Sequence, residues 1–156
     1  MPLTIELTPT PTDEARSLVE ELEAELSGPF TAEQRHGLSL AGIFQRHILF
    51  FIARLDGQAV GCGGIALQDG LAEVKRMYVR PDKRGQNVGR ALLAHLEAEA
   101  RARGIRRMVL ETGDVLERAI HLYTTAGFTP CAPFGDYALM PPPAIQRSVF
   151  LEKQIG

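Results

Sequence analysis

Hydrophobic residues along this chain fall into short runs and into helical repeats, and the change from one pattern to the other separates its elements. Runs rich in apolar, β-branched and aromatic residues predict strands at 3–7, 47–55, 58–67 and 71–79. The dipeptides Asp56-Gly57 and Asp69-Gly70 stand between the last three runs, and such a pair between two strands is a hairpin signal. The pattern therefore predicts a central antiparallel meander.

A helical repeat follows the first predicted strand. Its apolar positions are Ala15, Leu18, Val19, Leu22 and Leu26. We expect Thr10 to cap this helix, Pro11 to occupy its first position and Gly28 to follow its end. Residues 31–46 have a weaker helical pattern.

The second half of the chain alternates helices with strands. Helical patterns at roughly 88–103 and 116–126 each stop at a glycine, and strands are predicted at 105–111 and 148–153. A meander followed by strand–helix–strand–helix order is typical of an α+β fold. We expect one domain that spans residues 1–156, which is long enough to bury a core.

The overall composition narrows the kinds of partner. The 156 residues carry a formal net charge of −2, which gives no electrostatic basis for binding nucleic acid or an anionic membrane. No apolar run approaches the roughly 18 residues of a membrane span, and the N-terminus lacks the apolar core of a signal peptide. Cys62 and Cys131 lie far apart without metal-ligand spacing. We therefore expect a cytoplasmic protein with no metal site.

A basic loop that contains glycine leads into the helix predicted at 88–103. Arg84, Gly85, Gln86 and Asn87 precede Val88, near which the helix begins. The first amides of a helix lack intrahelical acceptors and form the positive end of its dipole. A loop in this position can turn its own amides towards an anion. The stretch therefore favours a phosphate or diphosphate ligand, the alternative being an ordinary surface turn.

Two residues just inside the helix strengthen the phosphate interpretation. Gly89 removes a side chain where a ligand would approach the backbone, and Arg90 joins Arg84 in adding charge suited to phosphate. Neither the P-loop pattern G-x-x-x-x-G-K-[ST] nor the dinucleotide pattern G-x-G-x-x-G occurs at this loop. We therefore expect a phosphate-bearing ligand bound in another way.

The stretch VRPDKRGQNVGRALL, which begins at Val79, resembles the acyl-coenzyme A binding motif of the GNAT superfamily of N-acetyltransferases, Q/R-x-x-G-x-G/A. Arg84 matches the first position of this motif and Gly89 the last. Asn87 stands where the family usually has the middle glycine.

A second stretch, LETGDVLERAIHLYTTAGF at 110–128, resembles the later motif of the same family. The matching positions are Ala119, Leu122, Tyr123, Gly127 and Phe128. Leu116 stands where many members have an asparagine that contacts the pantetheine arm. The resemblance covers roughly residues 48–153, and the two stretches have the expected order and separation.

The resemblance implies a GNAT-like fold: a mixed, mostly antiparallel sheet, splayed at its centre between strands 71–79 and 105–111, with helices on both faces. Acetyl-CoA, as co-substrate, would lie in that opening. Its pantetheine would pair like an extra strand with the backbone of Met77, Tyr78 and Val79, and an amide near Met77 would polarise the thioester carbonyl. Its diphosphate would lie beside Arg84 and Gly85, on the amides of Gln86, Asn87, Val88, Gly89, Arg90 and Ala91.

Acetyl transfer from a thioester needs a neutral amine, a stabilised oxyanion and a proton for the leaving thiolate. Tyr123 occupies the family's usual acid position, and a tyrosine with a reference pKa of about 10 is protonated at neutral pH. The alternative is that Tyr123 is a core aromatic residue on an amphipathic helix beside Leu116 and Ile120.

The general base has two candidates. Glu73 is the first choice, because the two-residue period of a strand puts it on one face with Lys75 and Met77. Glu111 is the second choice, and a water-relayed base would suffice for a weakly basic amine. The alternative for Glu73 is a solvated carboxylate paired with Lys75 or Arg107.

The remaining candidates are Cys62, His95 and Tyr137. We interpret Cys62 as a small residue in a glycine-rich strand rather than as a nucleophile, and His95 as a packed or half-exposed helical residue. Tyr137 lies in a predicted loop at 133–137 and is a candidate contact for the acceptor, because loops carry specificity.

The sequence therefore predicts an N-acetyltransferase that transfers the acetyl group of acetyl-CoA to a primary amine by direct attack in a ternary complex. The acceptor would be a small-molecule amine or a protein amine. The alternative is a non-catalytic acyl-CoA-binding or sensor module. The oligomeric state, a homodimer included, is left open.

Overall fold

The computed structural model describes residues 2–156. Its helices and strands, in chain order, are β1 (Leu3–Leu7), α1 (Asp13–Ser27), α2 (Leu40–Ile43), β2 (Ile48–Leu55), β3 (Gln58–Gln68), β4 (Leu71–Val79), α3 (Val88–Ala102), β5 (Arg107–Gly113), α4 (Glu117–Thr125), β6 (Thr129–Pro130), α5 (Pro142–Ile145) and β7 (Ser148–Gln154). Short 3-10 helices occupy Ala32–Gln34, Pro81–Lys83 and Gly135–Leu139. The predicted strands and long helices are thus confirmed, with ends that shift by at most about two residues.

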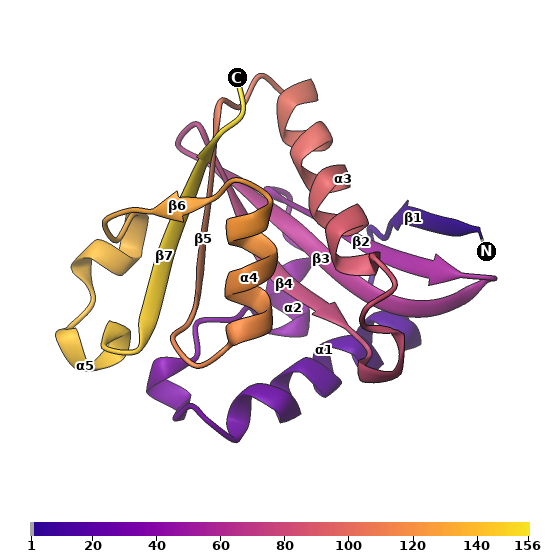
Figure 1. Ribbon diagram of the computed structural model, residues 1–156, viewed down its shortest axis with the longest axis horizontal. Coiled ribbons are helices and arrows are strands. Elements are labelled where there is room, and N and C mark those ends of the chain that lie inside the picture. Colours follow the sequence, from indigo (N-terminus) through magenta and orange to yellow (C-terminus); the bar gives the residue numbers. More distant parts are fainter. Residues whose placement is uncertain (1) are drawn as a thin grey trace.

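Within residues 2–156 the strands form one seven-stranded sheet in the order β1-β2-β3-β4-β5-β7-β6. All neighbours are antiparallel except β4 and β5, which run parallel. Helices α1 and α2 lie on one face of this sheet, and α3 and α4 lie on the other (Figure 1). The predicted α+β fold, with a mixed and mostly antiparallel sheet between helices, is confirmed. No helix in the described part of the chain is long and apolar enough to cross a membrane.

The sheet opens at its only parallel step in the described chain. Strands β4 and β5 pair through Leu71 with Arg107, Ala72 with Met108 and Glu73 with Val109. Beyond this point β4 continues to Val79 beside β3, and β5 continues to Gly113 beside β7. The predicted splay between these two strands is therefore present. It leaves two strand edges facing each other across a gap.

Strand β4 contains a bulge immediately beyond the opening. Lys75 pairs with Gly64 and Tyr78 with Cys62, so two residues of β4 stand opposite one residue of β3. One of these two, Arg76, has a φ of 54°. A positive φ is unusual for a residue with a Cβ atom, and it marks the point at which the strand is bent.

The bulge changes which side chains share a face. Val74 and Met77, three positions apart, both pack on the α3 side, in contact with the cluster that contains Leu93 and Leu96. Tyr78 packs on the α1 side instead. The prediction that Glu73, Lys75 and Met77 share one face is therefore wrong, because a strict two-residue period does not continue through a bulge.

Local signals near α1 also differ from the prediction. The cap is Thr12 rather than Thr10, since the Thr12 side chain accepts a hydrogen bond from the Ala15 amide at 3.1 Å. Gly28 follows the helix but has a right-handed φ of −67°, so the helix end does not use the conformational freedom of glycine. The weak helical pattern at 31–46 corresponds only to the short pieces at Ala32–Gln34 and α2.

Replacement of Thr12 by alanine tests this helix start. Thr12→Ala removes the acceptor for an N-terminal amide, and we expect the free energy of unfolding to fall by about 1 kcal/mol in urea denaturation. Thr10→Ala is the matched control and should change it by only a few tenths of a kcal/mol. A larger loss from Thr10→Ala would contradict the assignment of the cap.

Candidate active site

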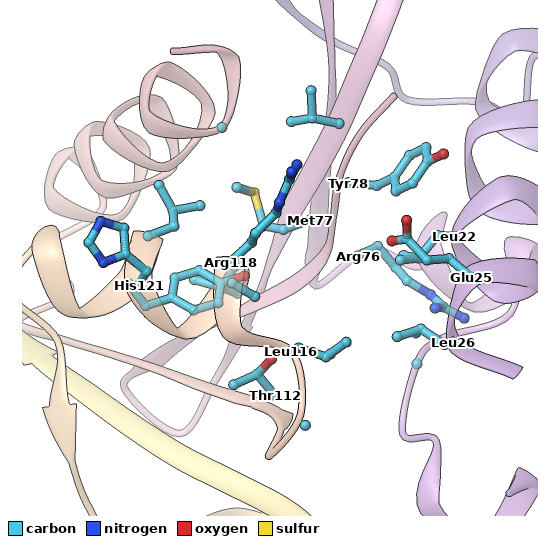
Figure 2. A pocket seen from close by; sticks show the side chains of 18 of the residues that line it. Leu22, Glu25, Leu26, Arg76, Met77, Tyr78, Thr112, Leu116, Arg118 and His121 are labelled. Carbon is cyan, nitrogen blue, oxygen red and sulfur yellow. The ribbon is translucent and has the colours of Figure 1, made fainter. Parts of the chain in front are cut away.

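A cleft of about 910 Å³ occupies the opening between β4 and β5. Its walls come from α1, the segment after α1, the second half of β4, the loop before α3, the end of β5, and α4. Figure 2 shows Met77 and Tyr78 of β4 between residues of α4, such as His121, and residues of α1, such as Leu26. The cleft therefore reaches both faces of the sheet through the gap.

One end of the cleft is formed by the start of α3. Asn87 caps this helix with φ 66° and ψ 14°, which is the left-handed conformation, and Gly85 has a φ of 82°. Asparagine tolerates this region better than most residues, which explains how it can replace a glycine here. The left-handed turn directs the chain so that Val88, Gly89 and Arg90 begin the helix at the cleft wall.

The hydrogen bonds at this end narrow the set of amides that an anion could reach. The Ala91 amide already donates to the Asn87 carbonyl at 3.0 Å. Gln86 is exposed, and the cleft lining includes its neighbours Gly85 and Asn87 but neither Gln86 nor Ala91. The cleft lining at this end thus includes Asn87 and the first helical turn, while the diphosphate site at Gln86–Ala91 stays a prediction.

The Arg84 side chain is bound to the protein itself. Its Nε donates to the Val79 carbonyl at 2.9 Å, and its Nη2 donates to Glu25 of α1 at 2.7 Å. Its guanidinium lies over the Tyr78 ring, 5.7 Å from the centroid. Arg84 thus holds the loop against α1 and β4, which differs from the expected phosphate contact.

Other cations line this end of the cleft. Besides Arg90, they are Lys83 and Arg118, and Figure 2 shows Arg118 on the α4 side. Sequence reasoning did not single out Lys83 or Arg118. Both lie inside the two motif stretches, so a search for basic residues within those stretches would have found them.

The edge of β4 that faces the gap carries backbone groups of Met77, Tyr78 and Val79. On its other edge this segment pairs with β3 through Tyr78 to Cys62 and Val79 to Gly61. The Tyr78 side chain points to the α1 face, where its hydroxyl donates to Glu21 at 3.1 Å. Burial, with the Glu21 carboxylate second, raises the pKa of Tyr78 to about 12. Tyr78 therefore presents its backbone to the gap, while its side chain lines the α1 side of the cleft (Figure 2).

Tyr123 of α4 is 6% exposed and packs edge-on against Phe128, with ring centroids 5.9 Å apart. Its hydroxyl makes no hydrogen bond within residues 2–156. Every fully buried polar side-chain atom in that range has a partner, so the hydroxyl is not fully buried. The hydroxyl must therefore reach the cleft that Tyr123 lines. Burial, and then the negative charge of Glu111, raise the pKa of Tyr123 above its usual range.

Glu111 of β5 lies on the cleft wall and accepts a hydrogen bond from the Ser148 hydroxyl of β7 at 2.5 Å. Burial raises the pKa of Glu111, while the bond from Ser148 and the charges of His36 and Lys75 oppose that rise. Ser148 is a partner that sequence reasoning missed. Its only signal is the strand pairing that brings β7 beside β5.

Glu73 belongs to a closed group of three side chains. The Tyr137 hydroxyl donates to Glu73 Oε2 at 2.7 Å, Lys75 Nζ lies 2.9 Å from the same oxygen, and Lys75 also donates to the Tyr137 hydroxyl at 3.0 Å. The expected alternative pairing of Glu73 with Lys75 is thus present, whereas Arg107 binds Glu152 at 2.8 Å.

Tyr137 does not lie on an exposed loop. It is 7% exposed within the 3-10 helix Gly135–Leu139 and packs edge-on against Phe134, Phe150 and His36. Burial, followed by Glu73, raises the pKa of Tyr137 above its usual range. The prediction of a loop at 133–137 is therefore wrong for this residue, because His36 and Phe150 from distant segments bury it together with the nearby Phe134.

The interpretations of Cys62 and His95 are confirmed. Cys62 is fully buried, its thiol donates to the Arg76 carbonyl at 3.3 Å, and burial raises its pKa to about 12. Such a thiol is not a nucleophile at neutral pH. His95 packs edge-on against Phe51 and lies 3.7 Å from Glu99 on the same helix.

The model of the acetyltransferase (GNAT) family matches residues 15–128, which is most of the chain. This chain belongs to the GNAT family of acetyltransferases. A protein of Azospirillum brasilense named IAA acetyltransferase is 42% identical over 145 residues, which cover 92% of each chain. The GNAT resemblance of the two motif stretches is thereby confirmed.

Solved structures agree with the GNAT assignment. A Klebsiella pneumoniae chain assigned as an acyl-CoA N-acyltransferase is 35% identical, with a TM-score of 0.80 over 99% of this chain and 98% of that one. The PaiA N-acetyltransferase of Thermoplasma acidophilum, solved in complex with coenzyme A, has a TM-score of 0.72 at 19% identity, over 97% of this chain and 99% of that one. This second likeness concerns the fold.

Two departures from the GNAT motifs have different structural consequences. Asn87 keeps the left-handed turn, as described above. Leu116 caps α4 with φ −86° and ψ 70°, and within the described chain its side chain makes no cap hydrogen bond. It lines the cleft as an apolar residue. The first departure therefore preserves the local geometry, and the second replaces a polar group by an apolar one.

Substitutions at Asn87 test the anion end of this GNAT cleft. Asn87→Gly keeps the left-handed turn, and we expect the Kd for CoA to stay within a few-fold. Asn87→Val places a β-branched residue in that turn and should weaken CoA binding by about 1–2 kcal/mol, or roughly five- to thirty-fold. Calorimetric titration with CoA, and with pantetheine as the ligand without a diphosphate, measures both effects.

Gln86→Val is the matched control, because Gln86 is exposed and lies outside the cleft lining. It should leave CoA binding unchanged. Equal CoA binding by Asn87→Val and Asn87→Gly would show that the shape of this turn is unimportant for the ligand.

Proposed function

We propose that this GNAT acetyltransferase transfers the acetyl group of acetyl-CoA to a primary amine by direct attack in a ternary complex, with Tyr123 as the acid and Glu111 as the base. The observation that carries the proposal is the Tyr123 hydroxyl. It belongs to a buried ring, has no protein partner within residues 2–156 and opens into the cleft on whose wall Glu111 also lies. A free donor and a half-buried carboxylate at one opening suit proton transfer in both directions.

The residues of the cleft fit acetyl-CoA. The gap-facing edge of β4 at 77–79 can pair with the amide groups of pantetheine, as an added strand would. The first amides of α3, with the cations Lys83, Arg90 and Arg118, suit the phosphate groups. When bound, acetyl-CoA supplies an activated acetyl thioester. The relative solved with coenzyme A has the same fold.

Tyr123 suits the role of proton donor to the leaving thiolate. Its raised pKa keeps the hydroxyl protonated throughout the physiological range. Because the hydroxyl has no acceptor within the described chain, no internal hydrogen bond must be broken before it donates. An amide near Met77 on the open edge of β4 is the candidate donor for the negative charge that develops on the acetyl oxygen.

Glu111 suits the base better than Glu73, which reverses the order expected from the sequence. Glu73 Oε2 already accepts from Tyr137 and lies 2.9 Å from the Lys75 ammonium, so a proton would have to compete with both. Glu111 is held by a single neutral donor, Ser148, and burial makes it more basic than an exposed carboxylate. Glu73 then serves to hold Tyr137 and Lys75 on the acceptor side.

The acceptor would enter from the α1 face, where His36, Glu73 and Tyr137 line the cleft. A small-molecule amine and a protein amine are the candidate classes. The relative named IAA acetyltransferase adds IAA to the compounds that merit testing.

The alternative function, a non-catalytic acyl-CoA-binding or sensor module, uses the same cleft without turnover. The single domain of residues 1–156, the cytoplasmic location, the absence of a catalytic metal and the oligomeric state stay predictions.

An assay of thiol release from acetyl-CoA tests the function. The panel comprises an α-amino acid, an aliphatic diamine, phenethylamine, a peptide with a free N-terminus, and IAA. Release that depends on one of these compounds, with an acetylated product found by mass spectrometry, supports the enzyme. CoA binding without release across a broad panel favours the sensor module, and absence of CoA binding contradicts both.

Replacement of Tyr123 by phenylalanine removes only the free hydroxyl. We expect Tyr123→Phe to lower kcat by about 10²–10⁴-fold while the Kd for CoA is kept, since the ring and its packing on Phe128 remain. Steady-state kinetics with the best amine and calorimetry with CoA measure the two quantities. Full activity of the variant would mean that Tyr123 only packs in the core and that water protonates the thiolate.

The pH dependence of kcat/KM distinguishes the two carboxylates. The base acts in its ionised form, so activity falls as the pH falls through the pKa of Glu111, which lies above the ordinary value for glutamate. Ser148→Ala removes a hydrogen bond that stabilises the ionised form, and the acidic limb should therefore move to higher pH. Glu111→Gln should abolish this limb.

Glu73→Gln is the comparison for the same measurement. It should keep the acidic limb, moved slightly to lower pH because the negative charge of Glu73 raises the pKa of Glu111, and it should act mainly on the KM of the acceptor. Loss of the limb in Glu73→Gln, with a normal profile in Glu111→Gln, would return the role of base to Glu73.

A further inference from the structure

Arg76 is the most unusual residue of β4. It stands at the bulge with a φ of 54° and is only 8% exposed, although it is charged. A residue with a Cβ atom keeps such a backbone conformation only where its surroundings hold it in place. A buried guanidinium likewise needs partners for its charge and its donors. The contacts of Arg76 therefore indicate what this position does.

The side chain of Arg76 reaches the α1 side of the cleft (Figure 2). Its Nε donates to the Leu38 carbonyl at 2.9 Å, and its Nη2 pairs with Glu23 of α1. Its backbone carbonyl accepts from the buried thiol of Cys62 at 3.3 Å. Both the backbone and the side chain of the bulge are thus held, the first by β3 and the second by α1 and the segment that follows it.

Gly37 makes this arrangement possible. Gly37 does not have a positive φ, so its backbone could accommodate alanine. A Cβ at this position would, however, overlap the guanidinium of Arg76 at Cζ, Nη1 and Nη2. The guanidinium lies against the bare backbone of Gly37, so a larger residue here would displace it from its present contacts.

The segment held by Arg76 forms one wall of the cleft. We call residues 30–38 the acceptor wall, because Phe30, Gln34, Arg35, His36 and Gly37 line the cleft on the α1 side. His36 packs edge-on against Tyr137 at 5.5 Å, and its Nε2 lies 2.7 Å from the Ala144 carbonyl. Tyr137 in turn donates to Glu73. Arg76 therefore joins β4 directly to the acceptor wall, and the acceptor wall contacts Tyr137.

We propose that Arg76 is a positioning residue for the acceptor: it fixes the acceptor wall on the bulge of β4, so that an incoming amine meets a preformed site. The proposal rests on the proposed function, since it takes the α1 side of the cleft as the acceptor side. Its effect is specific, because Arg76 makes these contacts away from the start of α3 and from Tyr123. Loss of these contacts should therefore impair binding of the acceptor and leave binding of CoA unchanged.

Steady-state kinetics with the best amine of the panel test the proposal. Arg76→Gln removes the charge that pairs with Glu23 and the Nε donor to the Leu38 carbonyl. Gly37→Ala displaces the guanidinium from its place. We expect each to raise the KM of the amine by about tenfold or more, while kcat and the KM of acetyl-CoA stay within about threefold. Arg76→Lys, which keeps the charge near Glu23 but cannot reproduce both contacts, should recover part of the loss.

The matched controls are a second arginine that binds α1 and the glycine that ends α1. Arg54 joins β2 to α1 through Glu14, at 2.5 and 2.8 Å, outside the cleft lining, and Arg54→Gln should leave both KM values unchanged. Gly28 has only the Glu25 carbonyl near its missing Cβ, at 3.8 Å, so Gly28→Ala should also be neutral. Equal rises of both KM values in Arg76→Gln would overturn the proposal.

A double variant tests the contact itself. In Arg76→Ala the space above Gly37 is vacant, so Gly37→Ala should add no further rise in the KM of the amine. Additive effects of the two substitutions would show that Gly37 acts independently of Arg76 and would count against this contact.

Hydrogen exchange decides the proposal even if the panel finds no acceptor. With CoA present, amide exchange of residues 30–38 should be faster in Arg76→Gln than in the unmodified protein and in Arg54→Gln. Exchange that stays unchanged would overturn the proposal. Failure of every amine to react would contradict the proposed function but would leave this result intact.

Discussion

The parallel pairing of β4 with β5 ends at Glu73, and the rest of the site depends on this early end. Each strand remains stable beyond that point because its other edge is paired, β4 with β3 except at the bulge and β5 with β7. The two facing edges therefore keep backbone groups whose hydrogen-bonding capacity is free for a ligand. A sheet that closed over the whole length of these strands would have the same core but no route from one face to the other.

In the proposed mechanism, the opening would let residues from different parts of the sheet and its helices act on one reaction centre. Tyr123 approaches on α4, whereas Glu73 and Glu111 lie on the strands that border the gap. The bulge at Arg76 adds a second asymmetry, since it turns Met77 towards α3 and keeps Tyr78 against α1. The proposed phosphate-binding and acceptor-binding surfaces would thereby lie on opposite faces of the sheet, which suits a reaction with two substrates that must not exclude each other.

Much of this architecture could be predicted from local signals. The hairpin dipeptides located the meander. The loop before α3 predicted the start of that helix, because a helix start and a left-handed residue are both determined within a few positions. The bulge could not be predicted, because a strand sequence does not reveal where its partner lacks a residue. The error over the shared face of Glu73 and Met77 follows directly from this.

Contacts between distant segments account for the other differences. Ser148 meets Glu111 through strand register, and the Arg84 side chain binds Glu25 of α1. Tyr137 is buried by the rings of His36 and Phe150, which come from separate elements, together with that of the nearby Phe134. None of these side-chain contacts produces a periodic pattern in the sequence. The choice between Glu73 and Glu111 accordingly depended on side-chain partners, which only the three-dimensional arrangement supplies.

The close approach of α3 to α4 has a consequence for how such a chain can change over time. A Cβ on Gly89 would lie 3.3 Å from Leu122 Cδ2 and 3.7 Å from Val79 Cγ2. The glycine of the first motif and the leucine of the second are therefore parts of one packing contact. An alanine at position 89 becomes easier to accommodate when position 122 carries a smaller side chain, so substitutions at these two sites should be acquired together in related chains, as a coupled pair rather than as two independent signatures.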